Sequence, residues 1–190
     1  MQLNNQLKKL TELLKKKKLK VAAAESCTGG LICYNLTKIP GSSKYFMMGV
    51  VSYSNKSKID LLKVRQKTLT KYGAVSAETC KEMCKNLLKT SKTNIAISVT
   101  GIAGPDGGTK KKPIGLVYIG ICSKKKLEII KFSFNKKLSR INIQNQTLIK
   151  TIKLIKNHIN IFLVSGVRFF GNCNFRVKGK YIITKKSYPR

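Results

Sequence analysis

The stretch VAAAESCTGG, from Val21 to Gly30, decides the fold of this chain. Its first four residues are small and apolar, which is typical of a short buried strand. The residues from Ser26 onward predict a tight turn, and the apolar segment 31–39 predicts a helix that Pro40 and Gly41 end. A strand that passes through a tight turn directly into a helix indicates an α/β fold.

Helical and strand patterns alternate along the rest of the chain. Leucines at helical spacing predict a first helix, which the lysine run 15–18 ends. Further strands are predicted at residues 46–53 and 94–100, a hairpin from strands 114–121 and 127–134, and helices at 58–62, 76–89 and 139–163. We therefore expect a three-layer α/β/α single domain with a mixed β-sheet over residues 1–163, followed at 164–190 by a basic, poorly ordered appendage.

The formal net charge of +32 is the most unusual feature of the composition, since 39 of the 190 residues are Lys or Arg. Such a field attracts polyanions, including nucleic acids and anionic membranes. However, the lysines are spread over nearly every segment, and AT-rich coding produces a high content of Lys, Ile and Asn in any protein. Arginine, which binds phosphates and base edges bidentately, is scarce. We expect no specific nucleic-acid partner, and a basic nucleic-acid-binding protein stays an alternative.

The cysteines and the single histidine bear on metal chemistry and on the compartment. None of the six cysteines forms a CxxC pair and His158 is the only histidine, so no zinc-type cluster is predicted. Cys80 and Cys84 lie one turn apart on an apolar helix face, where core packing is favoured over redox or metal chemistry. No signal peptide is recognised, and no apolar run approaches the ~18 residues of a membrane span. We expect a cytoplasmic protein with reduced thiols, no metal and no membrane partner.

Ser26 is the candidate nucleophile because it lies where the buried strand meets the helix. Backbone N–H groups at a helix start can point at a reacting oxygen, so one turn supplies a nucleophile and an oxyanion hole together. The alternative is that Ser26 only caps the helix. A Ser-His-acid triad is unfavoured, because the only imidazole, His158, lies on a late helix where it is expected to be solvated or to pack.

Lysine is the alternative general base, provided that burial or neighbouring positive charge lowers its pKa. Tyr53 and Lys58 follow the second predicted strand, and the Tyr53 hydroxyl can relay or orient a proton between the lysine and the serine. The alternative for any lysine in so basic a chain is a solvated surface charge. The Gly-rich segment 100–109 is also of interest, because its main-chain N–H groups can face a phosphate or a carboxylate. It matches neither a Walker A loop nor a GxGxxG fingerprint, and a purely structural connection is the alternative.

Five sequence blocks in this order resemble the CinA C-terminal domain family, the nicotinamide-nucleotide amidases. The resemblance runs from about residue 1 to 163 and is carried by Ala24–Gly30, Pro40–Ser43, Gly49–Asn55, Tyr72–Ser76 and Thr100–Gly108. It implies that Ser26 is the nucleophile and that Tyr53 and Lys58 complete the catalytic group. Full-length CinA proteins carry an N-terminal nucleotide-pyrophosphatase domain, so the chain resembles the stand-alone amidase.

The implied reaction is the deamidation of nicotinamide mononucleotide to nicotinate mononucleotide and ammonia, without a cofactor. Lys58, helped by Tyr53, takes the proton of Ser26, whose oxygen attacks the carboxamide carbon. Backbone N–H groups of the turn hold the oxyanion, and the Gly-rich loop with a later arginine holds the phosphoribosyl part. The expected substrate contacts are Cys27, Thr28, Gly29, Gly30, Thr100, Gly101, Ile102, Gly104 and Arg140. The resemblance also implies a homo-oligomer.

A third class of function is a catalytically decayed member of this family that acts as a binding module. Two features suggest it. Phe134-Asn135-Lys136 stands where the family commonly has a Gly-Asp-Arg turn, and the segment after residue 163 has no recognised counterpart. The presence of Ser26, Tyr53 and Lys58 argues against this alternative.

Overall fold

The computed structural model describes residues 2–164, so all but the first residue of the predicted appendage lies outside the described residues. A five-stranded sheet with the order β2-β1-β3-β4-β5 forms its centre. The three strands β2, β1 and β3 run parallel, whereas β4 and β5 are antiparallel to their neighbours, which confirms the predicted mixed sheet. The strands are β1 (Val21–Glu25), β2 (Phe46–Val51), β3 (Ile95–Gly101), β4 (Leu116–Cys122) and β5 (Leu127–Ser133).

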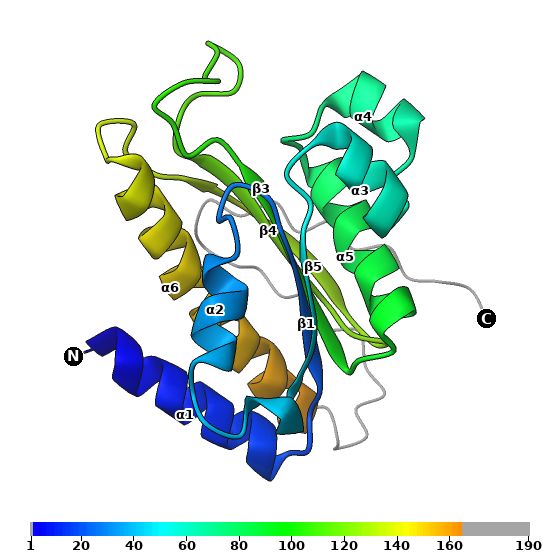
Figure 1. Cartoon of the computed structure of the whole chain (residues 1–190), viewed down its shortest axis with the longest axis vertical. Coiled ribbons are helices and arrows are strands. Elements are labelled where there is room, and N and C mark those ends of the chain that lie inside the picture. Colours follow the sequence, from blue (N-terminus) through cyan, green and yellow to red (C-terminus); the bar gives the residue numbers. More distant parts are fainter. Residues whose placement is uncertain (1, 165–190) are drawn as a thin grey trace.

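Helices cover both faces of the sheet, as the three-layer prediction requires (Figure 1). One face carries α1 (Gln2–Lys16), α2 (Leu31–Thr37) and α6 (Arg140–Val164), and the other carries α3 (Asn55–Leu62), α4 (Gln66–Tyr72) and α5 (Ala77–Ser91). All five residues of β1 are buried, because this strand has a neighbour on each side and a helical layer on each face. The α/β/α fold class is confirmed. Within residues 2–164 no helix combines the length and the apolarity that crossing a membrane requires.

Most predicted elements are present, with shifts at their ends that have local causes. The helix predicted at 58–62 begins at Asn55, because the Ser54 hydroxyl accepts a hydrogen bond from the Ser57 N–H at 3.0 Å and the Ser57 hydroxyl accepts one from the Ser54 N–H at 3.1 Å. The strand predicted at 46–53 ends at Val51. A short 3-10 turn, η1 (Ser42–Lys44), precedes it.

The helix α4 was not predicted, because a distant carboxylate supports it. Glu82 of α5 accepts hydrogen bonds from the backbone N–H of Arg65 at 2.9 Å and from the Thr68 hydroxyl at 2.7 Å, and it forms an ion pair with the Arg65 guanidinium. These contacts fix the first turn of α4 against α5. Only two residues of α4 itself, Thr68 and Leu69, are buried, so the segment has almost no apolar periodicity.

The strand order places a topological switch point at the carboxyl end of β1. The chain leaves β1 through α2 and returns in β2 on one side of it, and the later strand β3 pairs on the other side. In open α/β sheets, ligands bind in the crevice that this reversal creates outside the carboxyl ends of the strands. Ser26 is the residue that follows β1, so it lies at this point.

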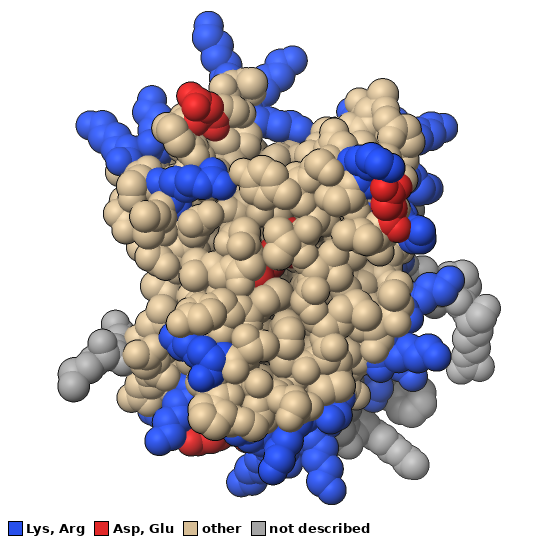
Figure 2. All heavy atoms as spheres, in the orientation of Figure 1, with Lys and Arg blue, Asp and Glu red and all other residues tan. Residues whose placement is uncertain are grey.

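The excess charge is unevenly distributed over the surface. The face shown in Figure 2 has Lys and Arg side chains around its margin, whereas its centre is largely free of them. The sequence is consistent with this, because residues 21–37 and 45–55, which supply β1, α2 and β2, contain no Lys or Arg. A chain of charge +32 therefore retains one broad, nearly uncharged surface.

Candidate active site

Ser26 lies in a tight turn that only glycines can complete. The Gly29 N–H donates to the Ser26 carbonyl at 3.1 Å, and Gly29 and Gly30 adopt the left-handed φ values +60° and +99°. An L-residue with a side chain is strained at such angles. The turn brings the chain from β1 into α2 with the Ser26 side chain only 8% exposed.

Glu25, which the sequence analysis did not single out, caps the helix that follows the turn. Its fully buried carboxylate accepts hydrogen bonds from the N–H groups of Gly30 at 3.1 Å, Ile32 at 3.1 Å and Cys33 at 2.7 Å. These donors and the positive end of α2 compensate the buried negative charge. The signal in the sequence was an acidic residue placed directly between an apolar strand and a helix.

The cap decides which N–H groups of the turn are available to a ligand. The N–H groups of Gly29 and Gly30 already have acceptors, namely the Ser26 carbonyl and the Glu25 carboxylate. Among the described residues the N–H groups of Cys27 and Thr28 have none, and the buried Thr28 hydroxyl also lacks a hydrogen-bond partner there. The sequence predicts an oxyanion contact from residues 27–30. In the described part of the chain, only Cys27 and Thr28 of these four have a main-chain N–H without an acceptor.

Lys58 reaches Ser26 from the other layer of the fold. It lies in α3 with a side chain that is 1% exposed, and its Nζ is 3.1 Å from the Ser26 Oγ. Two backbone carbonyls also accept from this Nζ, those of Ser52 at 2.6 Å and Tyr53 at 3.4 Å. Carbonyls only accept hydrogen bonds, whereas a hydroxyl also donates. A neutral amine, with two N–H groups and one lone pair, can therefore donate to both carbonyls and accept the Ser26 proton.

Burial lowers the pKa of Lys58 from its ordinary value. The opposing influence is the neighbouring Cys27 thiol, which favours the ammonium form only when it is ionised. Burial raises the pKa of Cys27 to about 12, so this thiol is neutral at neutral pH. The same result favours Ser26 over Cys27 as the nucleophile, because a cysteine reacts as its thiolate.

Tyr53 differs from the expected proton relay. Lys58 contacts the Ser26 hydroxyl directly, and the Tyr53 hydroxyl instead accepts a hydrogen bond from the Arg140 Nη2 at 3.0 Å. Tyr53 as a residue is 62% exposed. The contact between Tyr53 and Lys58 is made by the Tyr53 backbone carbonyl, which accepts a hydrogen bond from the Lys58 Nζ. The side chain belongs to the outer part of the site, together with Arg140.

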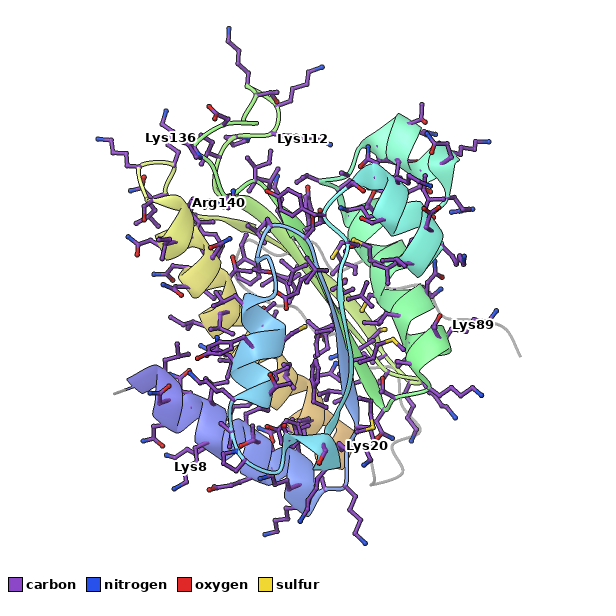
Figure 3. The ribbon with its side chains drawn as sticks, in the orientation of Figure 1. Lys8, Lys20, Lys89, Lys112, Lys136 and Arg140 are labelled. Atoms are coloured by element: carbon purple, nitrogen blue, oxygen red, sulfur yellow. The ribbon has the colours of Figure 1, made fainter. Side chains whose placement is uncertain are left out.

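Arg140 is the first residue of α6 and joins two segments of the site (Figure 3). Besides Tyr53, it binds the Gly104 carbonyl through Nη1 at 2.8 Å. The predicted contacts Gly104 and Arg140 are thus brought together. Lys112 and Lys136 lie at the same end of the molecule as Arg140 in Figure 3, so several positive charges gather there. Such charges favour an anionic ligand.

The other predicted residues of the Gly-rich loop already have partners. The Thr100 hydroxyl donates to the Ala74 carbonyl at 2.8 Å, and the Ile102 N–H donates to the Leu116 carbonyl at 2.9 Å. A Cβ at Gly101 would lie 2.7 Å from the Leu116 oxygen, so glycine is needed there for close strand contact. These three residues shape the base of the loop.

Gln144, one turn after Arg140 on α6, is a second residue that sequence reasoning missed. Its Nε2 donates to the Cys27 carbonyl at 2.8 Å, across a sequence separation of 117 residues. No local pattern marks such a contact. Two consecutive turns of α6 therefore touch the Gly-rich loop, Tyr53 and the turn that carries Ser26.

The only histidine lies away from this site. His158 is buried, and its Nε2 is 3.1 Å from the Ser123 hydroxyl. The β3–β4 register pairs Gly101 with Val117 and Ala96 with Cys122, so Ser123 lies at the opposite end of the sheet from the Ser26 turn. Cys80 and Cys84 are fully buried in the core, as expected. Over residues 2–164 no cluster of three His, Cys, Asp or Glu residues has the arrangement of a metal site.

Comparisons with known proteins show the family of the chain. The family model of the CinA C-terminal domain matches residues 4–159. A CinA-like protein of Endomicrobium trichonymphae is 53% identical over 147 residues, which are 77% of this chain and 34% of that protein. A CinA-like protein of Chloroherpeton thalassium is 57% identical over 116 residues, which are 61% of this chain and 28% of that protein. The chain thus spans about a third of the length of these relatives.

A solved structure is similar over most of its own length. The competence/damage inducible protein CihA from Agrobacterium tumefaciens shares 35% sequence identity with the chain, and the two superpose with a TM-score of 0.80. The match covers 83% of this chain and 95% of that one.

Proposed function

The chain belongs to the CinA C-terminal domain family, and on that basis we propose that it is a serine amidohydrolase that converts nicotinamide mononucleotide to nicotinate mononucleotide and ammonia. The observation that carries the proposal is the contact between the buried Lys58 amine and the Ser26 hydroxyl. Among residues 2–164 no carboxylate holds this amine in its charged form, and its two other partners there are neutral carbonyls.

The first half of the reaction is acyl transfer to Ser26. The neutral Lys58 amine takes the hydroxyl proton while the Ser26 oxygen forms a bond to the carboxamide carbon. The negative charge that develops on the carboxamide oxygen is stabilised by the free N–H groups of Cys27 and Thr28. The Lys58 ammonium then gives its proton to the departing nitrogen, the C–N bond breaks, and ammonia leaves an acyl ester on Ser26.

The second half returns the enzyme to its starting state. A water molecule gives a proton to Lys58 as its oxygen attacks the ester carbon, and the same N–H groups hold the oxyanion again. The proton passes from Lys58 back to the Ser26 oxygen when the ester bond breaks. Nicotinate mononucleotide is released, and no redox partner or cofactor takes part.

The outer part of the site suits the phosphoribosyl group. Arg140 uses Nη1 and Nη2 for the Gly104 carbonyl and the Tyr53 hydroxyl, and the remaining N–H groups of its guanidinium are left for phosphate oxygens. In this proposal Tyr53 orients Arg140 through its hydroxyl and orients Lys58 through its carbonyl. The loop after Gly101 completes the same side of the site.

We also propose a cytoplasmic homo-oligomer. The edge strand β2 has the sequence FMMGVV, without a charge or a proline to block pairing, and its Met47 and Val51 are 43% and 46% exposed. It belongs to the nearly uncharged surface, where two copies of a basic chain can meet with least repulsion. The free, mostly buried cysteines among the described residues suit a reducing compartment.

The decisive experiment measures ammonia release from nicotinamide mononucleotide by the purified protein and by its Ser26→Ala variant. We expect turnover by the first and a loss of at least ~10³-fold in the second, because the variant lacks the attacking oxygen. Unchanged thermal unfolding shows that the variant is folded. Full activity without the Ser26 hydroxyl would refute the assignment. Substrate binding without any ammonia would favour the decayed binding module, and steeply salt-dependent DNA binding that competes with substrate would favour the nucleic-acid alternative.

A further inference from the structure

The last helix holds the nucleophile turn through a single hydrogen bond. Gln144 donates its Nε2 to the Cys27 carbonyl at 2.8 Å, in a partly buried position. Cys27 follows the nucleophile directly, so this bond acts on the peptide unit between Cys27 and Thr28. No other described hydrogen bond to that carbonyl is present.

The geometry of a peptide bond links this carbonyl to a catalytic donor. In a trans peptide the C=O of one residue and the N–H of the next point in opposite directions. Fixing the Cys27 carbonyl toward α6 therefore fixes the Thr28 N–H toward the opposite side. That N–H is one of the two in the turn that have no acceptor among the described residues.

The remaining bonds of the turn lie around this peptide unit and do not involve its own C=O or N–H group. The Glu25 carboxylate holds Gly30 and the first residues of α2, and the Gly29 N–H holds the Ser26 carbonyl. Without Gln144 the Cys27–Thr28 peptide has no side chain among the described residues to resist its rotation. A rotated peptide would turn a carbonyl oxygen, instead of an N–H, toward the developing negative charge.

We propose that Gln144 is a positioning residue for the oxyanion hole, which keeps the Thr28 N–H directed at the oxygen of the tetrahedral intermediate. This inference rests on the proposed acyl transfer at Ser26. Arg140, one helical turn earlier, binds the Gly104 carbonyl and the Tyr53 hydroxyl, so the start of α6 orients the outer site and the oxyanion hole together.

The test replaces Gln144 by methionine, which has a similar size and no N–H donor. Loss of one oxyanion-hole donor lowers kcat by ~10²–10³-fold in other serine hydrolases, and a misdirected donor is expected to cost ~10–100-fold. KM for nicotinamide mononucleotide stays within about twofold of the wild-type value, because the ground-state carbonyl uses this donor little. Gln146→Met is the matched control, since Gln146 is exposed on the same helix and no described hydrogen bond involves its side chain. It keeps full activity.

A second readout separates this inference from the identity of the substrate. A fluorophosphonate labels an activated serine, and its phosphoryl oxygen occupies the oxyanion hole. We expect the wild type to be labelled at Ser26 and Gln144→Met to be labelled ~10–100-fold more slowly, with the pH at half-maximal labelling unchanged because the contacts of Lys58 remain. Labelling of the wild type without ammonia release would overturn the proposed substrate and leave the role of Gln144 testable.

Two results would overturn the role of Gln144. One is a kcat and a labelling rate of Gln144→Met equal to those of the Gln146→Met control. The other is a loss that appears only in KM, which would indicate a substrate contact. Gln144→Ala provides the same comparison if the methionine variant does not fold. Gln144→Glu is expected to lose more than either, because its carboxylate repels the Cys27 carbonyl.

Discussion

The two ends of the sheet hold their ionisable groups, the buried Lys58 and the partly buried Glu128, in opposite ways. At the Ser26 end, Lys58 is buried against two neutral carbonyls and a hydroxyl. At the other end, Glu128 forms an ion pair with Lys126 and lies 4.0 Å from the Nδ1 of His158. Within the described part of the chain the first group has no opposite charge to compensate its burial, whereas the second has a cation beside it.

The pKa shifts follow this difference. Burial without a counter-charge lowers the pKa of Lys58 and so favours the neutral amine. The nearby His158 ring and the ion pair with Lys126 outweigh burial at Glu128 and lower its pKa to about 2, which favours the charged form. The first shift costs stability and prepares a base, whereas the second stabilises the fold. Of these two shifts, only the one at Lys58 yields a base that can take a proton at neutral pH, so Lys58 is the candidate catalytic group.

Lys58→Met is expected to have the largest effect on activity. Removing the general base lowers kcat by ~10²–10⁴-fold. The free energy of unfolding stays within ~1 kcal/mol of the wild-type value, because removal of a polar group that is costly to bury offsets the loss of a donor to the Ser52 carbonyl. Steady-state ammonia release and urea unfolding measure the two quantities.

The control is Lys58→Arg, which retains a positive charge that does not deprotonate and should also be inactive. In the wild type, activity should rise with pH through the lowered pKa of Lys58, with a midpoint below 10.5. Between that midpoint and the ordinary value the unfolded chain binds the proton and the folded chain does not, so stability also rises with pH there. Activity in Lys58→Arg would contradict the assigned role.

Glu128→Gln is expected to have the converse effect: it lowers the free energy of unfolding and leaves the rate of ammonia release unchanged. A pKa lowered from 4.5 to about 2 corresponds to a loss of ~2–3 kcal/mol in the free energy of unfolding at pH 7, for a carboxylate that is 19% exposed. Because the folded pKa is the lower one, this stabilisation is complete above pH 4.5 and is lost as the pH falls toward 2. Urea unfolding at pH 7 and pH 3 measures it, and the difference between the variant and the wild type should be smaller at pH 3 than at pH 7.

Glu12→Gln is the matched control for net charge, because Glu12 is exposed on α1 and loses the same single charge. It should change the free energy of unfolding by less than ~0.5 kcal/mol. An equal loss in both variants would mean that global charge, and not the contacts of Glu128, explains the effect.

What the sequence could predict follows from the range of the contacts involved. The β1-turn-α2 unit and the position of Ser26 depend on residues 21–39, so their local pattern is sufficient. Lys58 and Ser26 are only 32 residues apart in the sequence. They follow the parallel strands β2 and β1, whose carboxyl ends lie at the same edge of the sheet. The fold class and the Ser26–Lys58 end of the molecule were therefore within reach of sequence reasoning and family resemblance.

The rest of the site depends on contacts that no local pattern carries. Tyr53 meets Arg140 across 87 residues and Cys27 meets Gln144 across 117 residues, so the partner of the Tyr53 hydroxyl and the role of Gln144 needed the packed structure. A local sequence pattern also does not show which backbone N–H groups of the turn lack an acceptor. Whether Gly30 or Thr28 serves an oxyanion depends on the side chain of Glu25, which the sequence shows only as one acidic residue before a turn.

Arg140→Met is expected to have the smallest effect. At the other end of the sheet the Lys126 ammonium pairs with a carboxylate of the protein itself. This variant tests whether the Arg140 guanidinium pairs in the same way with the phosphate of the substrate. Loss of a charged phosphate contact should raise KM for nicotinamide mononucleotide about tenfold, which corresponds to ~1.4 kcal/mol. KM for nicotinamide riboside, which has no phosphate, should hardly change. Lys136→Met removes a charge at the same end from an exposed position, so its smaller effect should vanish in high salt. An equal rise for both substrates would instead show that Arg140 acts by holding Gly104 and Tyr53 in place.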